Sequence, residues 1–415
     1  MCIKRQVARE PTGQVSVVAG LGRATLTLPD TIASPISFTA HAPEAAMAGR
    51  SNPLEVMPAG ADRVYFGDLH AHAVASDAAQ RERGVPFASG GFGAYEPAYA
   101  YARDVAGLDF VAVALFHDVW DDPEYRELTR RFLEPGRFVP FTAVEVSDKT
   151  AGHRVVLFPG DDAPPIRGRM VEELWPVLEG TGALAIPHHT NASSEGGPQS
   201  WDVQDWRRFN PRFQPVVEMC QTRGAFETDE PGGATLIGGR GASVQNALAL
   251  GCRVGFAGGT DNHYGQPGSH RCFKAGVDYH DHVVGGLTAV FAPELTREAI
   301  LRALWQRRCY ATTGARMILD FRVDGHPMGQ EVPCPSGSVE VAARVVGEAP
   351  VATVELLQDN RIVHAQAYDD RRVEYRHTVT LALGAGQTTW LYLRVTQTDG
   401  HVGWASPVWL SAAER

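Results

Sequence analysis

Hydrophobic and polar positions follow different patterns in the middle of the chain and at its two ends. From about residue 64 to about residue 313, short and nearly continuous runs of Val, Ile, Phe and Ala alternate with segments whose apolar residues recur at helical spacing. Such runs are typical of parallel strands that helices cover on both faces, so the sequence predicts an α/β fold. The expected strands are Val64–Gly67, Phe110–Leu115, Val139–Val144, Ala183–Pro187, Pro215–Met219, Arg253–Ala257 and Leu287–Phe291, and the expected helices are Tyr95–Ala106, Pro123–Phe132, Val171–Leu178, Ala242–Leu250 and Thr296–Arg307. Seven strands in about 250 residues favour a closed barrel over an open sheet.

Both flanking stretches alternate apolar and polar residues with a period of two, which indicates strands with one buried face. Near the N-terminus the alternation is short and is interrupted by Gly and Pro. Towards the C-terminus it recurs in the segments Ile318–Val323, Val339–Val345, Ala352–Gln358, Arg361–Ala367, Tyr375–Leu383, Trp390–Thr396 and Trp404–Leu410. We therefore expect an N-terminal arm with short strands at residues 1–60, the barrel at residues 61–316, and an immunoglobulin-like antiparallel β-sandwich at residues 317–415.

The composition narrows the classes of function. A formal net charge of −10 argues against nucleic-acid binding through a basic surface, although bound cations can still attract an anionic substrate. The six cysteines are scattered without a C-x-x-C pair, which indicates free thiols rather than a zinc ribbon or a disulfide framework. Neither a signal peptide nor a membrane helix is indicated by the apolar segments. We expect a cytoplasmic protein that binds a small molecule, without membrane or nucleic acid as partner, and a homo-oligomer is compatible with the sequence.

Ionisable residues gather where the predicted strands end. They are His70, His72 and Asp77 after the first strand, His117 after the second, Glu145 at the end of the third and His153 on a short strand just after it, His188 and His189 after the fourth, and Asp261 and His263 after the sixth. The carboxyl ends of parallel barrel strands meet on one face, so these side chains are expected to converge. Packing does not require ionisable groups there, and unpaired ones would be costly.

The spacing of these residues indicates metal binding. Residues two apart in an extended segment point the same way, so His70 and His72 can address one point, as can Asp261 and His263. Imidazole nitrogens and carboxylate oxygens suit Zn²⁺, Mn²⁺ or Fe²⁺, and a carboxylate such as Glu145 can bridge two ions. Each motif alone is better explained by a buried, hydrogen-bonded side chain than by a metal site. Their coincidence at successive strand ends carries the prediction.

This ordered set, beginning with Gly67-Asp68-Leu69-His70-Ala71-His72, resembles the PHP superfamily of polymerase and histidinol phosphatase domains over roughly residues 64–315. A narrower resemblance is to a group of uncharacterised PHP-like proteins called DUF3604. It rests on the segments Ile186–Thr190, Gly259–His263, Gly286–Val290 and Arg308–Gly314. The resemblance implies a distorted seven-stranded (β/α)7 barrel of PHP type with two or three divalent ions.

Carried over residue by residue, the resemblance implies three ion positions. The first would use His70, His72, Glu145 and Asp261, the second Glu145, His153 and His188, and the third Asp77, His117 and His263. The chain departs from the pattern at Phe116, where the superfamily often has Asp before the histidine, and at Arg223, where relatives often carry His before Gly224. Arg223 could bind an anionic group in bidentate fashion or serve in a surface ion pair.

The sequence therefore predicts hydrolysis by a metal-bound hydroxide in a site of two or three metal ions. It contains neither a G-x-S-x-G elbow nor a P-loop. A phosphate ester is the substrate class that the resemblance implies, with His189 or His270 as a source of the leaving group's proton and Arg223 as an anion ligand. Two alternatives stay open: a metal-dependent amidase or esterase that cleaves a C–N or C–O bond, and a non-catalytic protein whose sandwich binds a glycan or protein.

Overall fold

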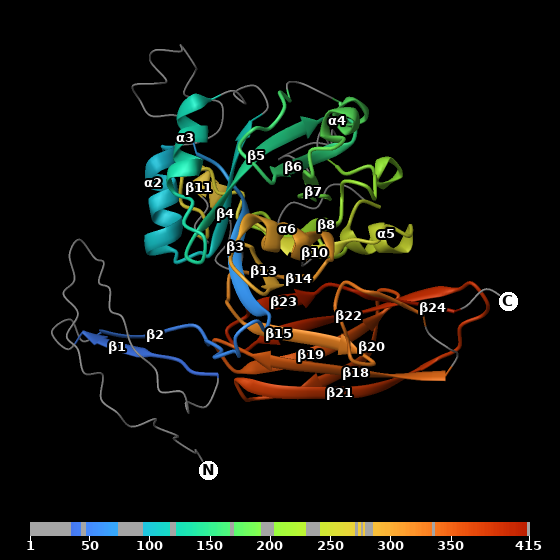
Figure 1. Ribbon diagram of the computed structural model, residues 1–415. Helices are drawn as coiled ribbons and strands as arrows, with labels where there is room; N and C mark the ends of the chain where they lie inside the picture. Colours follow the sequence, from blue (N-terminus) through green and yellow to red (C-terminus); the bar gives the residue numbers. More distant parts are fainter. Residues whose placement is uncertain are drawn as a thin grey trace. The chain divides into compact units, whose positions relative to one another are not determined.

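The computed structural model describes residues 35–42, 47–73, 94–116, 122–166, 170–191, 203–229, 241–269, 273–274, 277–278, 285–333 and 337–412 (Figure 1). All of them belong to the unit Pro35–Arg415. The strands expected within the first 34 residues lie outside the described residues. Short antiparallel pairs are formed by β1 (Thr39–Ala42) with β2 (Met47–Arg50) and by β11 (Phe273–Lys274) with β12 (Val277–Asp278).

The middle of the chain mixes strands and helices. Its strands are β3 (Arg63–Ala71), β4 (Phe110–Phe116), β5 (Val139–Asp148), β6 (Gly152–Phe158), β7 (Leu184–His188), β8 (Val216–Gln221), β9 (Gly224–Ala225), β10 (Gly255–Gly258), β13 (Leu287–Ala292) and β14 (Cys309–Thr312). Its helices are α2 (Tyr95–Ala100), which continues into a π-helical segment at Tyr101–Val105, α3 (Pro123–Arg131), α4 (Val171–Leu178), α5 (Val244–Ala249) and α6 (Arg297–Trp305), with a 3₁₀ turn at Trp206–Arg208. Every strand and helix expected here is present, with some ends shifted by a few residues.

The last hundred residues form strands that pair antiparallel, except that β17 and β24 are parallel to each other. They are β15 (Ile318–Val323), β16 (His326–Pro327), β17 (Glu331–Pro333), β18 (Gly337–Val346), β19 (Val351–Gln358), β20 (Arg361–Ala367), β21 (Arg372–Leu381), β22 (Thr388–Gln397), β23 (Val402–Ala405) and β24 (Val408–Ser411). One strand was expected at Trp404–Leu410, and that prediction is wrong: Pro407 has no backbone N–H to donate, and the chain divides into β23, which pairs with β14, and β24, which pairs with β17.

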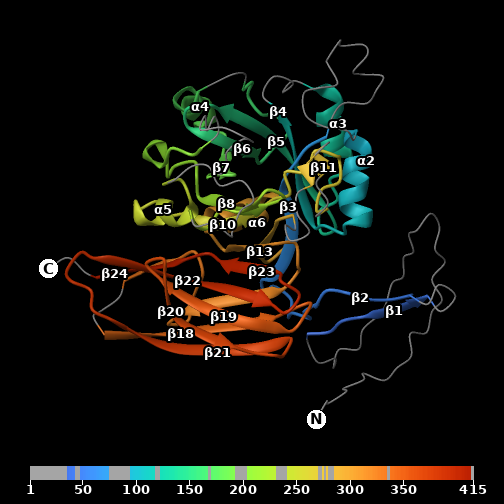
Figure 2. The same cartoon turned by 180° about the vertical axis from the view of Figure 1, so that it is seen from behind.

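One large sheet joins the middle of the chain to the C-terminal strands (Figures 1 and 2). Its order is β17-β24-β22-β23-β14-β13-β3-β4-β5-β6-β7, with β19 and β20 attached through β22. A four-stranded sheet, β16-β15-β18-β21, lies against the C-terminal part of it, and both contribute to one apolar core. The fold is therefore a strand-dominated mixture of α and β structure.

The structure does not show the predicted distorted seven-stranded (β/α)7 barrel. Strands β3, β4 and β5 are parallel, but β6 runs antiparallel to β5 and β7, and β13 runs antiparallel to β3. Strands β8 and β10 form a separate parallel pair, which the Thr288 hydroxyl joins to β13 by accepting from Gly258 N at 2.8 Å and donating to its carbonyl at 2.6 Å. The strand direction was missed because a strand buried on both faces is equally apolar in either direction.

Helix α3 packs against two neighbouring strands, β4 and β5. Asp122 caps it by accepting from the backbone N–H of Glu124 at 2.9 Å, and Pro123 occupies the first turn, where its missing N–H costs nothing. The helix buries Tyr125, whose hydroxyl donates to the Val113 carbonyl at 2.8 Å and accepts from Ala143 N at 2.9 Å. One side chain thus fixes α3 against both β4 and β5.

Asp109, at the start of β4, gives a pH-dependent prediction. Its carboxylate accepts from Phe66 N at 2.8 Å, and burial raises its pKa from 3.8 to about 6. Because the folded pKa lies above the unfolded one, the stability supplied by the neutral carboxyl is present at low pH and lost as the pH rises towards about 6. The Asp109→Asn variant stays neutral and keeps an acceptor for Phe66 N. We therefore expect its free energy of unfolding at neutral pH to exceed that of the wild type by about 1–3 kcal/mol. Urea unfolding measures this difference, and a gain that persists below the unfolded pKa would contradict the explanation.

Candidate metal centre

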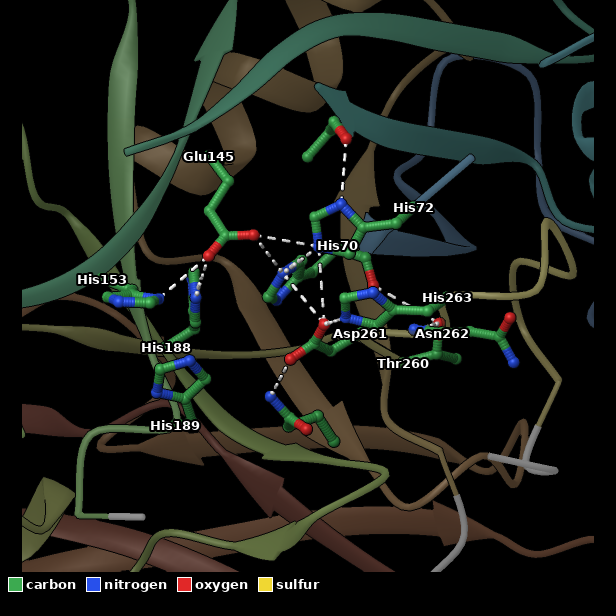
Figure 3. Close-up of polar contacts among 12 residues, drawn as sticks. His70, His72, Glu145, His153, His188, His189, Thr260, Asp261, Asn262 and His263 are labelled. Carbon is green, nitrogen blue, oxygen red and sulfur yellow. Dashed lines mark hydrogen bonds and ion pairs between the residues drawn. The ribbon is translucent and has the colours of Figure 1, made fainter. Parts of the chain in front are cut away.

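The first group of possible ligands lies at the end of β3 and contains His70, His72 and Asp261, with one oxygen of Glu145 (Figure 3). The Nε2 atoms of the two histidines are 3.2 Å apart. Asp261 Oδ1 lies 3.6 Å from His70 Nε2 and 3.4 Å from His72 Nε2. Glu145 Oε2 lies 3.8 Å from the first of these nitrogens and 3.0 Å from the second. All four side chains are buried.

Hydrogen bonds on the far sides of the two imidazoles decide which nitrogen faces the group. His72 Nδ1 lies 3.0 Å from the Ala114 carbonyl oxygen, which can only accept, so Nδ1 carries the proton and the Nε2 lone pair faces inward. His70 Nδ1 lies 2.9 Å from Glu218 Oε2, an arrangement common behind metal-binding histidines. Lone pairs and carboxylate oxygens thus face one another, and a cation between them would neutralise their repulsion.

The pKa of each histidine reflects its surroundings in the absence of an ion. Burial alone would lower the pKa of His70, but the carboxylates of Glu218 and Glu145 outweigh it and raise the pKa to about 9. Burial lowers the pKa of His72. A proton on His70 is therefore the alternative to a metal ion as the positive charge in this group.

The second group surrounds the other oxygen of Glu145. His153 Nδ1 lies 2.9 Å from Glu145 Oε1, and His188 Nε2 lies 3.5 Å from it. One ring nitrogen of His189 completes four possible ligand atoms that all lie within 4.8 Å of one another. Three buried ring nitrogens have no hydrogen-bond partner among the described residues: both nitrogens of His188 and Nδ1 of His189.

Protonation states in this second group suit metal ligands. Burial holds the pKa of His188 and of His189 well below its usual range, so both imidazoles are neutral. Burial would raise the pKa of Glu145, but its contacts with the imidazoles of His153, His188, His70 and His72 hold that pKa well below its usual range. The carboxylate is ionised and the imidazoles keep free lone pairs, which is the form in which both bind metals.

Buried partners behind the ligands hold the two halves of the first group together. Asp68 is fully buried and accepts from His70 N at 3.0 Å, Thr260 N at 2.9 Å and Gly268 N at 2.8 Å, so it ties β3 to the segment after β10. Asp261 is oriented through its outer oxygen Oδ2, which accepts from Gln221 Nε2 at 2.8 Å and from Arg223. These contacts leave Oδ1 of Asp261 directed at the histidines.

The structure brings together most of the candidate residues. Those in the two groups are His70, His72, Glu145, His153, His188, His189 and Asp261. His263 lies beside the first group, with Nε2 2.8 Å from Asp261 Oδ1. Arg223 contacts Asp261, and its role as an anion ligand stays a prediction. Asp77, His117 and His270 lie outside the described residues, so the third expected ion position cannot be assembled from them.

The sequence did not identify Gln221, Thr260 or the Ala114 carbonyl as parts of the site. It also assigned no role to Asp68. Asp68 carried a usable signal, because it lies two residues before His70 in an extended strand and therefore points to the same side. A backbone carbonyl such as that of Ala114 leaves no trace in the identity of its residue. Glu218 also lies behind the possible ligands, with Oε2 2.9 Å from His70 Nδ1.

Replacing Glu218 by glutamine is expected to lower the affinity of the first group for a divalent ion by about 10-fold or more. The amide oxygen can still accept from His70 Nδ1, but it brings no negative charge to strengthen the imidazole as a ligand. Titration with Zn²⁺ against a coloured chelator measures the affinity. Unchanged affinities at every ion position would show that Glu218 has only a packing role.

The fold and these groups define a mixed α/β protein with two adjoining buried groups of possible metal ligands. The family model "Protein of unknown function (DUF3604)" matches residues 269–326, a range that includes two of the four segments on which the narrower resemblance rests. An uncharacterised protein of Chlamydia trachomatis is 28% identical over 358 residues, which are 77% of this chain and 55% of that protein. One of Chlamydia pneumoniae is 28% identical over 355 residues, 76% of this chain and 54% of that protein. The chain thus spans about half the length of the curated relatives it matches.

Among solved structures, a two-domain protein of Bacteroides vulgatus, described as containing a predicted PHP-like metal-dependent phosphoesterase, is 13% identical and has a TM-score of 0.44, covering 88% of this chain and 99% of its own. Within the part of the chain that the structure describes, none of the helices combines the length and the apolar character needed to cross a membrane.

Proposed function

We propose that this protein is a metal-dependent hydrolase in which two divalent ions are bridged by Glu145. The observation that carries the proposal is the division of this carboxylate between two groups: Oε2 lies 3.0 Å from His72 Nε2, and Oε1 lies 2.9 Å from His153 Nδ1. A bridging carboxylate is typical of two-metal hydrolytic sites, whose ions lie about 3.5–4 Å apart.

The spacing of the first group supports this proposal. Five distances between its ligand atoms range from 3.0 to 3.8 Å. Four ligands at about 2.0–2.1 Å from a tetrahedral ion lie about 3.4 Å from one another. Hydrogen bonding alone does not account for the arrangement, because His72 Nε2 is an acceptor that faces two carboxylate oxygens.

The proposed ligands are His70, His72, Asp261 and Glu145 for one ion and Glu145, His153 and His188 for the other, with Asp77, His117 and His263 for a third, as the PHP resemblance implies. Ions held there would lower the pKa of water and offset negative charge on a substrate's oxygens. The chain's own contribution is orientation. Glu218 fixes the ring of His70, the Ala114 carbonyl fixes His72, and Gln221 with Arg223 fixes Asp261.

A phosphate ester is the substrate class we propose, in line with the PHP resemblance. The chain carries a formal net charge of −10, so an anionic substrate would be attracted by the ions and Arg223 rather than by the protein surface. Cleavage of a C–N or C–O bond is the alternative, because the same ligands suit that chemistry.

The experiment is a hydrolysis panel. Chelator-treated protein is reloaded with Zn²⁺, Mn²⁺ or Fe²⁺ and assayed on phosphate monoesters, phosphate diesters, carboxylic esters and amides. We expect metal-dependent turnover of phosphate esters and none in a His70→Ala/His72→Ala double variant. Turnover of amides or carboxylic esters alone would favour the alternative. Equal activity of the double variant and the wild type would reject a metal-dependent hydrolase.

A further inference from the structure

His189 occupies an unusual place at the end of β7. In a regular strand neighbouring side chains point to opposite faces, so His188 and His189 should diverge. His189 instead has a backbone φ of 34°, in the left-handed region that residues other than glycine rarely adopt. The two ring centroids lie 4.4 Å apart, and both histidines offer a ligand atom to the same group (Figure 3). A strained backbone thus directs two consecutive imidazoles to one point.

The imidazole of His189 is buried with one of its ring nitrogens unsatisfied by the described residues. It is 7% exposed, and its Nδ1 has no hydrogen-bond partner among them. Its ring lies 4.9 Å from that of His153, centroid to centroid. A buried polar atom without a partner is costly, and so is a left-handed backbone at a residue with a side chain. Strain of this kind at a site is expected where a bound ligand offsets it.

We propose that His189 is a fourth protein ligand of the ion held by Glu145, His153 and His188, and that it makes this position selective for zinc. The inference rests on the proposed function and extends it, since the PHP resemblance implies only three ligands here. Three imidazoles and one carboxylate are a closed, nitrogen-rich set that suits Zn²⁺ in tetrahedral geometry. Mn²⁺ and Mg²⁺ prefer six ligands that are mostly oxygen.

The two ion positions then differ in kind. The group around His70 and His72 has two imidazoles and two carboxylates, whereas the group around His188 and His189 has three imidazoles and one carboxylate. The first should exchange Zn²⁺ for Mn²⁺ more readily than the second. His189, with its nitrogen committed to the ion, is then no longer a source of the leaving group's proton.

The test uses the full chain and needs no substrate. Apo protein is titrated with Zn²⁺ against a coloured chelator, and Co²⁺ is loaded separately, because its visible absorption is strong in four-coordinate sites and weak in larger coordination shells. We expect His189→Gln to weaken one Zn²⁺ position by about 100-fold or more and to reduce the Co²⁺ absorption, with the other position unchanged. His189→Cys supplies a thiolate and should restore much of the affinity. His364→Gln, in the C-terminal strands, is the matched control.

A measurement on the wild type keeps the proposal testable if the variants fold poorly: in excess Mn²⁺ one Zn²⁺ per chain should remain bound while the other ions exchange. The proposal is overturned if His189→Gln keeps every Zn²⁺ affinity and the full Co²⁺ absorption, including the case in which only the pH profile of hydrolysis changes. It is also overturned if all ions of the wild type exchange equally. Wild-type protein that binds no divalent ion would instead reject the proposed function.

Discussion

Replacing Glu145 by glutamine is expected to lower hydrolytic turnover by about 1,000-fold and to reduce the number of tightly bound divalent ions. The carboxylate is the one side chain of the described residues whose two oxygens face both ligand groups, at 3.0 Å from His72 Nε2 and 2.9 Å from His153 Nδ1. Glutamine has nearly the same shape, but it offers one neutral oxygen and an NH₂ group that cannot bind a cation. A loss of about 4 kcal/mol of transition-state stabilisation corresponds to this effect.

Metal analysis of the purified variant, together with turnover under saturating Zn²⁺ or Mn²⁺, measures both effects. Glu173→Gln is the matched control, because Glu173 lies on the exposed side of α4 and its replacement removes the same charge from the chain. The control should keep its metal and its turnover. A Glu145→Gln protein with unchanged ion content and wild-type turnover would show that the carboxylate does not bridge two ions.

Much of this site could be predicted because its ligands obey simple geometry. His70 and His72 are two apart where β3 ends, and they do point to one place, with their Nε2 atoms 3.2 Å apart. The apolar runs of β5, β7 and β10 led to Glu145, which lies within β5, to His188 at the end of β7, and to Asp261, which follows β10. Periodicity and the polarity of strand ends therefore sufficed to bring together residues separated by nearly two hundred positions.

The parts that could not be predicted depend on backbone direction and conformation. The apolar run of β6 gave no sign that the strand returns antiparallel between β5 and β7, yet this return brings His153 opposite His188 in the ladder. Alternation also predicts that His188 and His189 diverge, and a single positive φ reverses this. Such a conformation is imposed by tertiary packing and the site, and local sequence does not encode it.

The C-terminal strands contribute to the site through Glu227, the basis of the last prediction. This buried carboxylate follows β9 and accepts three hydrogen bonds from strands β22 and β23: from Tyr392 Oη at 2.8 Å, Arg394 Nη1 at 2.8 Å and Trp404 Nε1 at 2.9 Å. The carbonyl of the next residue, Thr228, accepts from Asn191 Nδ2 at 2.9 Å. Asn191 lies three residues after His188 in the chain. Strands β22 and β23 thus hold the segment that supports the end of β7.

Replacing Glu227 by alanine is expected to lower the free energy of unfolding by about 3 kcal/mol, because three donors, one of them charged, lose their acceptor in a buried setting. Glu355→Ala is the matched control, since Glu355 pairs with the same Arg394, at 2.7 Å from Nε, but its side chain is 19% exposed against 7% for Glu227. We expect the control to cost about 1 kcal/mol or less. Urea unfolding of both variants gives the two values. If they are equal, Glu227 is an ordinary ion-pair residue, and the C-terminal strands are not required to hold the segment next to the candidate metal ligands.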